Sequence, residues 1–440
     1  MTYAQATEFL FSLRRFGWRL GLETVERLLS LLDNPQARVP SIHIGGTNGK
    51  GSTAAMLSAI LQAAGYRTGL YTSPHLLDFT ERIRVNGVPI GEAEVTRLTA
   101  QLKDLCSVHF AQQPIPNPPS DRLPHPTFFE LTTAMAFLHF ARQAVQAGVI
   151  EVGLGGRFDA TNVITPQVAV VTNVSLEHQE YLGRTLPEIA MEKAGIIKTN
   201  VPVVTATQGE SYEVIQRTAA DRRAPLVNIH EAYTYTIRES GLAGQTLDLT
   251  GPVRRYEDLR IPLAGRHQAE NAVTAIAVAE VLENLGFHLG EAAIRRGLTH
   301  ARWPGRLQVV SDRPRIVLDG AHNPAGAQVL AAFLAEHRSA LNRLIMVFGV
   351  LKDKDWEAML APLGPLTDQT ILTHPPADRG ADPHELVTAD RYCSKVEIAA
   401  DPGEGLGLAR TMARPEDTIL VTGSLYTVAA ALRALNIAVG

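Results

Sequence analysis

The sequence predicts an α/β protein whose first domain contains a mostly parallel sheet. Between residues 39 and 173, short apolar runs alternate with segments in which apolar residues recur with the period of a helix. The first run, residues 41–44, is typical of a buried strand, and the segment after it presents one apolar helix face until Gly65. Because parallel strands need long crossover connections, this alternation favours a parallel sheet covered by helices.

The remaining elements of the first domain follow the same pattern. Strands are expected at residues 68–71, 149–152 and 168–171, and a long helix at residues 128–147. Residues 112–119 are too rich in proline for a helix or a central strand. We therefore expect an exposed loop there, near the functional site.

A second domain is predicted to begin near residue 300. The helical segment at residues 271–285 is followed by the segment 299–305, which ends in Pro-Gly, and strand and helix patterns then resume. This second part has no further glycine-rich loop of the kind described below. We expect a domain of residues 1–299 and a smaller Rossmann-like α/β domain of residues 300–440 that closes over a shared cleft.

The composition is that of a soluble globular protein. Of the 440 residues, 45% are hydrophobic and 20% are charged, and the formal net charge is -4, which excludes a disordered chain and a surface built to bind polyanions. Cys106 and Cys393 lie far apart and match neither a disulfide framework nor a zinc site. The N-terminus lacks the pattern of a secretion signal, and no run of about 18 apolar residues occurs. We expect a cytoplasmic monomer without membrane or nucleic-acid partners.

A glycine-rich loop at residues 45–52, Gly-Gly-Thr-Asn-Gly-Lys-Gly-Ser, lies between the first strand and its helix. In this setting backbone N–H groups and the helix N-terminus favour phosphate oxygens, and Lys50 would contact the β- and γ-phosphates. The loop departs from the strict Walker spacing because its first glycine is one residue too close and Gly51 separates Lys50 from Ser52, while Thr47 breaks the Rossmann fingerprint. A glycine turn with a surface lysine is the alternative. The strand before and the helix after favour ATP binding.

ATP chemistry also needs Mg²⁺, whose preferred ligands are oxygens, so candidate ligands are expected at strand ends. Glu151 ends an apolar run at such a position, and an ion pair with Arg157 is its alternative role. The loops 72–75 and 175–178 offer oxygen or imidazole ligands at the same edge, although each alone is typical of a capping loop. Lys193 lies on an expected helix, where the residues by themselves indicate a solvated surface lysine.

Nine motifs follow one another along the chain, at residues 46–52, 72–76, 81–83, 127–130, 151–157, 192–197, 265–271, 303–306 and 319–324. In this order they resemble the folylpolyglutamate synthase and dihydrofolate synthase family, within the Mur-ligase superfamily of ATP-dependent enzymes that form amide bonds. The resemblance spans essentially the whole chain. The last motif is otherwise explained as a turn capped by Asp319 and Asn323.

The resemblance implies ATP and Mg²⁺ as cofactors and assigns the residues that hold them. ATP would be bound by Thr47, Asn48, Gly49, Lys50, Gly51, Ser52, Asn271, Arg306 and Asp319. Mg²⁺ would be bound by Ser73, Glu151 and His178. Lys193 would be carboxylated on its amine and join Lys50 and His322 as a catalytic residue. Carboxylation would replace a cation that repels Mg²⁺ with an oxygen ligand that the ion prefers.

The resemblance also implies a site for the acceptor substrate. It would be formed by Arg82, Thr127, Phe128, Phe129, Glu130, Phe158, Asp159 and Ala160, in segments that match those contacting a pterin and pteroate portion. One phenylalanine of the Phe128–Phe129 pair is suited to stacking on a flat heterocycle, and core packing is expected for the other.

The family's reaction phosphorylates a substrate carboxylate with ATP, and the amine of L-glutamate then attacks the acyl phosphate. We expect dihydropteroate and reduced folates both to serve as acceptors, with a monofunctional folylpolyglutamate synthase as the alternative. Another Mur-type amino-acid ligase is disfavoured by the Phe128–Phe129 segment and by the absence of an additional N-terminal UDP-binding domain. A nucleotide-dependent switch is the remaining alternative, although no guanine-reading Asn-Lys-x-Asp motif occurs.

Overall fold

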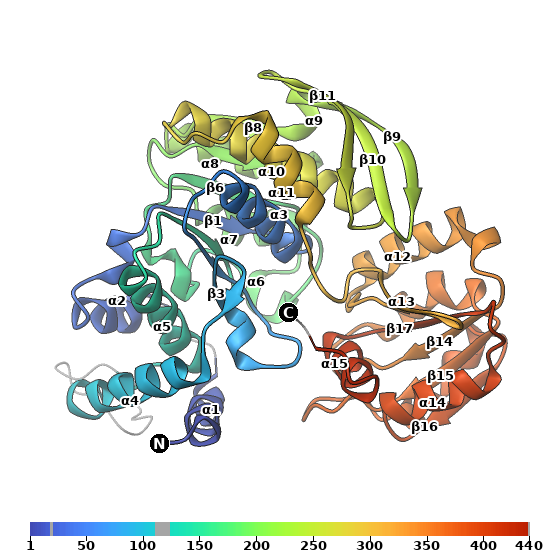
Figure 1. Ribbon diagram of the computed structural model, residues 1–440. Coiled ribbons are helices and arrows are strands. Elements are labelled where there is room, and N and C mark those ends of the chain that lie inside the picture. The colour runs from blue at the N-terminus through green and yellow to red at the C-terminus, as the bar shows by residue number, and fades with distance from the viewer. Residues whose placement is uncertain (18–20, 111–123, 439–440) are drawn as a thin grey trace. The chain divides into compact units, whose positions relative to one another are not determined.

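The computed structural model describes residues 1–17, 21–110 and 124–438 (Figure 1). The chain forms two compact units, neither of which is one continuous segment. Unit 1 comprises Met1–Thr234, Leu249–Arg255 and Glu270–Ala301, and unit 2 comprises Tyr235–Asp248, Tyr256–Ala269 and Arg302–Gly440. The proline-rich stretch at residues 112–119, expected to be an exposed loop, lies outside the described residues.

Unit 1 is built around an eight-stranded sheet with the order β4-β3-β2-β5-β1-β6-β7-β8. Its strands are β1 (Ser41–Gly45), β2 (Thr68–Tyr71), β3 (Ile83–Val85), β4 (Val88–Pro89), β5 (Ala147–Glu151), β6 (Val168–Val171), β7 (Val203–Thr205) and β8 (Leu226–Asn228). The neighbours from β2 to β8 are parallel, whereas β3 and β4 join antiparallel at one edge. Every residue of β1 and β5 is buried, as in parallel strands covered on both faces. The predicted mostly parallel α/β sheet is confirmed.

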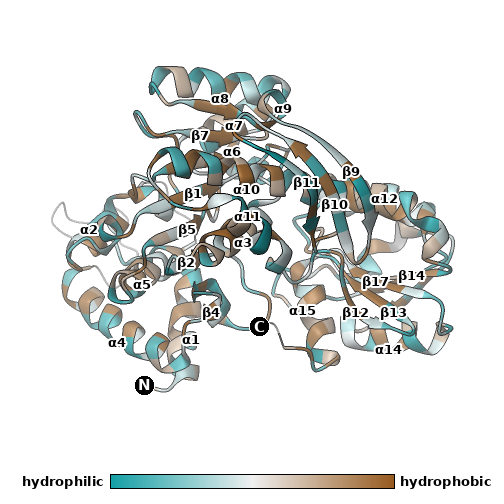
Figure 2. Ribbon diagram, turned by 45° about the horizontal axis from the view of Figure 1, so that its top comes forward, coloured by the Kyte–Doolittle hydropathy of each residue, from teal (hydrophilic) through white to brown (hydrophobic). Residues whose placement is uncertain are grey.

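The helices of unit 1 pack their apolar faces on this sheet and on one another. They are α1 (Tyr3–Ser12), α2 (Glu23–Ser30), α3 (Lys50–Ala63), α4 (Glu92–His109), α5 (Phe128–Arg142), α6 (Gln179–Leu182), α7 (Leu186–Ala194), α8 (Gly209–Asp221), α9 (Ile229–Ala232), α10 (Arg266–Asn284), whose first residues belong to unit 2, and α11 (Gly290–His300). One core cluster joins α1, α2, α4 and α5 through the fully buried Leu10, Leu28, Leu102 and Phe137. In Figure 2, β1 and β5 are mainly hydrophobic, whereas α4 and α8 also carry hydrophilic residues.

Unit 2 contains a six-stranded sheet with the order β12-β13-β17-β14-β15-β16. Its strands are β12 (Gln308–Asp312), β13 (Arg315–Leu318), β14 (Leu344–Phe348), β15 (Gln369–Thr373), β16 (Val396–Ala399) and β17 (Thr418–Thr422), and its helices are α12 (Pro324–Glu336), α13 (Trp356–Leu363), α14 (Pro402–Met412) and α15 (Leu425–Ala434). The strands are parallel except for the antiparallel pair β12–β13. This smaller α/β sheet domain agrees with the predicted fold class.

A three-stranded sheet was not predicted. It consists of β9 (Thr234–Gly241), β10 (Gly244–Thr250) and β11 (Arg255–Ile261) in the order β11-β10-β9. Most of it groups with unit 2, although it lies before residue 300 in the sequence. Among the described residues, no helix is both long and apolar enough to cross a membrane.

The predicted element boundaries hold for the strands better than for one long helix. The strands β2 and β6 have the predicted ends, and the helix α10 starts five residues earlier, at Arg266 instead of 271. Helix α5 ends at Arg142 rather than at residue 147, because Ala144 has a φ of 50° and β5 begins at Ala147. A left-handed residue does not continue a helix. The apolar sequence runs on through this turn, so hydrophobicity alone did not mark it.

Candidate functional site

The glycine-rich loop connects the end of β1 to the start of α3 in a confined place. Gly46 has a φ of 139°, and a Cβ there would lie 1.9 Å from Thr172 Oγ1. Gly49 has a φ of 85°, and a Cβ there would lie 2.4 Å from Asn271 Oδ1. Both positions therefore require glycine, for space as well as for backbone conformation. The loop lies against the end of β6 and against α10, which an open surface turn would not do.

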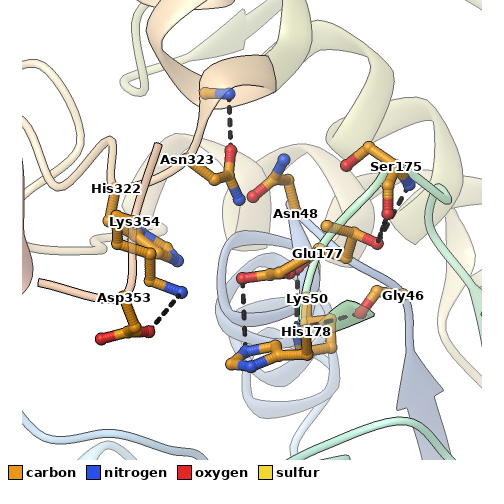
Figure 3. Close-up of polar contacts among 12 residues, drawn as sticks. Gly46, Asn48, Lys50, Ser175, Glu177, His178, His322, Asn323, Asp353 and Lys354 are labelled. Carbon is orange, nitrogen blue, oxygen red and sulfur yellow. Dashed lines mark hydrogen bonds and ion pairs between the residues drawn. The ribbon is translucent and has the colours of Figure 1, made fainter. Parts of the chain in front are cut away.

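The segment after β6 holds this loop in shape. Thr47 N donates to the carbonyl oxygen of Asn173 at 2.8 Å, and Asn48 N donates to its side-chain Oδ1 at 2.9 Å. Ser175 N donates to Thr47 Oγ1 at 3.1 Å, a contact that Figure 3 shows. The Thr172 hydroxyl donates to the Asn48 carbonyl at 2.7 Å. A loop fixed in this way can receive phosphate oxygens with little reorganisation.

Lys50 is the first residue of α3, and its side chain folds back over the loop. Its Nζ donates to the carbonyl oxygens of Gly46 at 3.0 Å and Thr47 at 2.9 Å (Figure 3). The ammonium group therefore lies near the N-terminus of α3, where the helix dipole also favours an anion. Ser52, in the same helix turn, is buried. This arrangement is suited to the phosphates of a nucleotide.

The strand register brings two predicted metal ligands to the edge where the loop begins. Glu151 at the end of β5 pairs in register with Ile44, next to Gly45. Its carboxylate is buried, and Oε2 accepts a hydrogen bond from Ser73 N at 3.0 Å. The alternative ion pair with Arg157 is not found, because that side chain is 57% exposed and lies 3.8 Å from a carboxylate oxygen of Glu192.

The loop after β6 supplies the third predicted ligand. His178 has a φ of 49°, and its Nε2 lies 3.5 Å from Glu177 Oε1 (Figure 3). Within the described ranges, no group of three or more His, Cys, Asp or Glu side chains is clustered for metal binding. The donor set still fits Mg²⁺, since this ion takes few oxygen ligands from a protein and fills its other positions with water and phosphate.

The helical position of Lys193 alone indicated a solvated surface residue, but the structure buries this side chain. It is 3% exposed. Burial, together with the positive charge of Lys50, lowers the pKa of its amine to about 7 against the opposing effect of Glu177. These three residues therefore share one electrostatic environment. An amine with this pKa is substantially neutral at physiological pH and can act as a nucleophile toward carbon dioxide.

The two predicted phenylalanines have different surroundings. Phe129 stacks on Tyr71 with ring centroids 6.0 Å apart, and a Cβ at Gly153 would lie 2.5 Å from its ring. Phe128 instead lies under two guanidinium groups, with Arg14 Cζ at 5.3 Å and Arg82 Cζ at 5.2 Å from its ring centroid. Phe129 therefore fills a packing position, and Phe128 belongs to a cationic aromatic cluster.

This aromatic cluster includes residues that the sequence reasoning missed. The Phe128 ring lies 5.8 Å from that of Phe11 and 6.4 Å from that of Phe79, and Arg82 Nε donates to His75 Nδ1 at 2.8 Å. Arg82 was predicted for the acceptor site, and His75 lies in the loop after β2 that was predicted as a source of ligands, so the missed residues are the rings of Phe11 and Phe79 and the contact that His75 makes with Arg82. Helix α1 gave no signal beyond its amphipathic pattern.

Three of the predicted substrate residues are engaged mainly by the protein itself. Thr127 and Glu130 form the capping box of α5, with Thr127 N donating to Glu130 Oε2 at 2.7 Å and Glu130 N donating back to Thr127 Oγ1 at 3.3 Å. Asp159 is 2% exposed, and both of its carboxylate oxygens accept hydrogen bonds from protein groups. Phe158 is partly buried, and the Arg157 guanidinium stacks on its ring at 4.8 Å. The buried Ala160 follows directly.

In unit 2, the predicted nucleotide residue Asp319 lies in a buried polar turn after β13. Asp319 Oδ2 accepts from Leu307 N and Oδ1 from Ala321 N, both at 2.9 Å. Burial raises the pKa of Asp319, and the charge of Arg306 opposes that effect. A Cβ at Gly320 would lie 2.4 Å from Arg306 Nη1, so glycine makes room for the guanidinium. The aspartate thus ties the residue that follows Arg306 to the turn after β13.

The neighbouring side chains complete this turn. Asn323 caps α12, because its Oδ1 accepts from Gly326 N at 2.8 Å. His322 Nδ1 lies 2.8 Å from the Gly320 carbonyl, which only accepts, so Nδ1 carries a proton and Nε2 is the basic nitrogen of the neutral ring. The capped turn that was the alternative explanation of this motif is present, and it coexists with an oriented imidazole.

The chain is similar to known proteins over almost its full length. Residues 44–279 match the family model described as the Mur ligase middle domain, and residues 305–425 match that of the Mur ligase, glutamate ligase domain. The chain is 38% identical over 432 residues to a dihydrofolate synthase/folylpolyglutamate synthase of Bacillus subtilis, covering 96% of this chain and 97% of the relative.

Two solved structures have the same fold. One is the Mycobacterium tuberculosis folylpolyglutamate synthase complexed with ADP and AMPPCP, with a TM-score of 0.90, 35% identity, and coverage of 100% of this chain and 99% of that one. The other is the Escherichia coli FolC in complex with DHPP and ADP, with a TM-score of 0.86, 31% identity and 99% of both chains covered.

Proposed function

The chain belongs to the Mur ligase family, among the dihydrofolate synthases and folylpolyglutamate synthases, and we propose that it uses ATP to join L-glutamate to dihydropteroate and to reduced folates. Family membership over nearly the whole chain supports an ATP-dependent ligase. The finer proposal, that both acceptors are used, follows the relative from Bacillus subtilis, which is named for both activities.

One structural observation carries the proposal. The loop after β2 contacts the phosphate-loop edge at one end, where Ser73 N donates to Glu151, and the aromatic cluster at the other end, where Arg82 lies over Phe128. A triphosphate and a flat, anionic acceptor are therefore provided with neighbouring sites in unit 1. That proximity is what phosphoryl transfer to an acceptor carboxylate requires.

The residues of the phosphate loop would bind and orient the nucleotide. Backbone N–H groups from Thr47 to Ser52 and the ammonium of Lys50 would hold the β- and γ-phosphates, with Asn271 beside Gly49. An acceptor carboxylate oxygen attacks the γ-phosphorus, and the bond to the β–γ bridging oxygen breaks, giving ADP and an acyl phosphate. The amine of L-glutamate then attacks the acyl carbon, and inorganic phosphate leaves as the amide forms.

Mg²⁺ would be held by Ser73, Glu151 and His178. When bound, the ion neutralises phosphate charge and polarises the γ-phosphoryl group. Lys193 would complete this side of the site after carboxylation, in which its neutral amine attacks carbon dioxide, forms an N–C bond and releases one proton. The burial of Lys193 and the pKa of about 7 support this role, because only the neutral amine reacts.

Unit 2 is proposed to contribute Arg306, Asp319 and His322. Asp319 would act by holding the backbone that follows Arg306 against its own turn, since its oxygens already accept from Leu307 N and Ala321 N. Arg306 would stabilise negative charge on the nucleotide. His322 would present Nε2, because its Nδ1 is committed to the Gly320 carbonyl.

The test supplies ATP, Mg²⁺ and L-glutamate with either dihydropteroate or tetrahydrofolate, and follows ADP release and the mass of the pterin product. We expect one glutamate added to each acceptor. Silence with dihydropteroate would leave a monofunctional folylpolyglutamate synthase. ADP release without any mass increase would favour the nucleotide-dependent switch, and ligation of other amino acids to a different acceptor would favour another Mur-type enzyme.

A further inference from the structure

A histidine lies in the middle of the central strand of unit 1. His43 is fully buried in β1, where it pairs in register with Ile150 of β5 and Ala169 of β6. Its Nε2 lies 2.8 Å from Thr161 Oγ1. A polar ring in such a core is costly unless it is hydrogen-bonded, so this contact stabilises its position. The reaction described above makes no use of His43.

The direction of the hydrogen bonds follows from the chemistry of the groups. Thr161 Oγ1 lies 2.5 Å from Asp159 Oδ1, and an ionised carboxylate only accepts, so the single hydroxyl proton of Thr161 points to Asp159. Thr161 Oγ1 must then accept from His43, which places the ring proton on Nε2. Burial, assisted by the charge of Lys198, lowers the pKa of His43 to about 3, so the ring is neutral and carries this one proton. Its Nδ1 has no hydrogen-bond partner within the described residues.

The chain of hydrogen bonds ends in the loop that follows β5. Asp159 Oδ2 accepts from Gly153 N at 3.0 Å and from Leu154 N at 2.9 Å, and Oδ1 also accepts from Thr161 N at 3.0 Å. With the Thr161 hydroxyl, four donors surround this carboxylate and fill its acceptor sites. The network thus runs from the core strand to two backbone amides that come directly after Glu151 and Val152.

We propose that His43 is a positioning residue for the acceptor site: by donating to Thr161 it fixes the Asp159 carboxylate, which in turn holds the loop from Gly153 to Ala160 in one shape. This inference rests on the proposed function and on the expectation from the family resemblance that Phe158 and Ala160 contact the acceptor. A site is effective only when its supporting shell keeps it within a fraction of an ångström of the productive geometry. His43 provides that support from the strand β1, and Thr161, in the short helical turn Ala160–Val163, passes it on to Asp159.

Two matched pairs of variants test the network. Thr161→Val removes the hydroxyl and keeps the shape, whereas Thr161→Ser keeps the hydroxyl. His43→Leu removes the ring donor, whereas His43→Gln retains a donor close to the position of Nε2. We expect Thr161→Val and His43→Leu to raise the KM for dihydropteroate about tenfold while the KM for ATP stays within about twofold of wild type. The Thr161→Ser and His43→Gln variants should remain near wild type. Combining Thr161→Val with His43→Leu should raise the KM for dihydropteroate no further than the more impaired single variant does.

A second measurement reads the loop directly, without activity. Hydrogen exchange of the Gly153 and Leu154 amides should be faster in Thr161→Val than in Thr161→Ser. The other amides of unit 1 should exchange equally fast in the two variants, and the two melting temperatures should be equal. If both acceptor and ATP KM values rise by the same factor, or neither changes, His43 does not position the acceptor site. If His43→Leu does not fold, Thr161→Val decides alone. A wild-type protein that ligates no glutamate would overturn the proposed function, and amide exchange would still decide whether the network holds the loop.

Discussion

Replacing Lys193 by methionine should abolish ligation and at the same time stabilise the fold. The pKa of this amine is about 7 in the folded protein, against 10.5 for an ordinary lysine. Its folded pKa is lowered, so the unfolded chain binds more protons between these values and burying the lysine costs stability. At pH 7 the linkage relation gives a cost of roughly 4 kcal/mol. At pH 9 this cost falls to roughly 2 kcal/mol, because removing the proton costs less as the pH approaches the pKa of the unfolded lysine.

The measurement is urea unfolding of wild type and Lys193→Met in buffer free of carbon dioxide, at pH 7 and pH 9. We expect the variant to gain about 2 to 4 kcal/mol at pH 7 and less at pH 9, because methionine buries its side chain without a charge to desolvate. The matched control is Lys395→Met, where the lysine is exposed and no such gain is expected. ADP release and product mass are followed in parallel.

The activity arm separates a carboxylated lysine from a merely buried one. Lys193→Ala should lose ligation and recover part of it when short carboxylic acids are added, since these can replace the missing carboxylate. Full activity of Lys193→Ala would refute the catalytic role. A Lys193→Met protein that is less stable than wild type at pH 7 would refute the electrostatic reasoning, because it would show that the ammonium is favourably paired.

Three further predictions concern the other parts of the site. Gly46→Ala should lose ATP binding in calorimetry, because its Cβ would meet a hydroxyl oxygen at 1.9 Å, whereas Gly65→Ala, at a positive φ with no atom within 4 Å, should only lose about 1 kcal/mol of stability and bind normally. Phe128→Leu should raise the acceptor KM about tenfold with unchanged melting temperature, and Phe129→Leu should instead lower stability by about 1 to 2 kcal/mol; the reverse pattern would contradict the assignment of the two rings. Asp319→Ala should cost unit 2 about 2 to 4 kcal/mol in denaturant unfolding by leaving two backbone N–H groups unpaired, and an unchanged midpoint would show that they find other partners.

The features that sequence predicted well are those encoded locally. The glycine-rich loop is recognisable because its glycines, its preceding strand and its following helix are neighbours along the chain, and their geometry leaves little choice of residue. The position of Glu151 beside this loop also follows from sequence, since the ends of parallel strands meet at one edge of the sheet. In the structure, Glu151 pairs in register with Ile44, one residue before the loop begins. The structure adds the contact with Ser73, which lies in the loop after a different strand, β2.

The features that sequence did not predict depend on what packs against a residue from elsewhere. The burial of Lys193 is decided by the elements that cover α7, and the period of the helix does not contain that information. Phe128 and Phe129 are adjacent and chemically identical, and only their neighbours separate them. The three-stranded sheet did leave a signal that was overlooked, since Gln245, Leu247 and Leu249 alternate as buried residues along β10.

The carboxylates of Asp159 and Asp319 show why a variant that loses activity does not by itself identify a ligand. Asp159 and Asp319 were both assigned to bound molecules, yet each accepts hydrogen bonds from backbone N–H groups at both oxygens. Replacing either by asparagine would turn one acceptor into a donor that faces another donor, so the loop would be disturbed even though the side chain keeps its size. A loss of activity in such a variant therefore does not identify a ligand. A ligand is identified by comparing the substrate affinity of the variant with the amide exchange of the same loop. Loss of a direct contact lowers the substrate affinity and leaves the amide exchange unchanged.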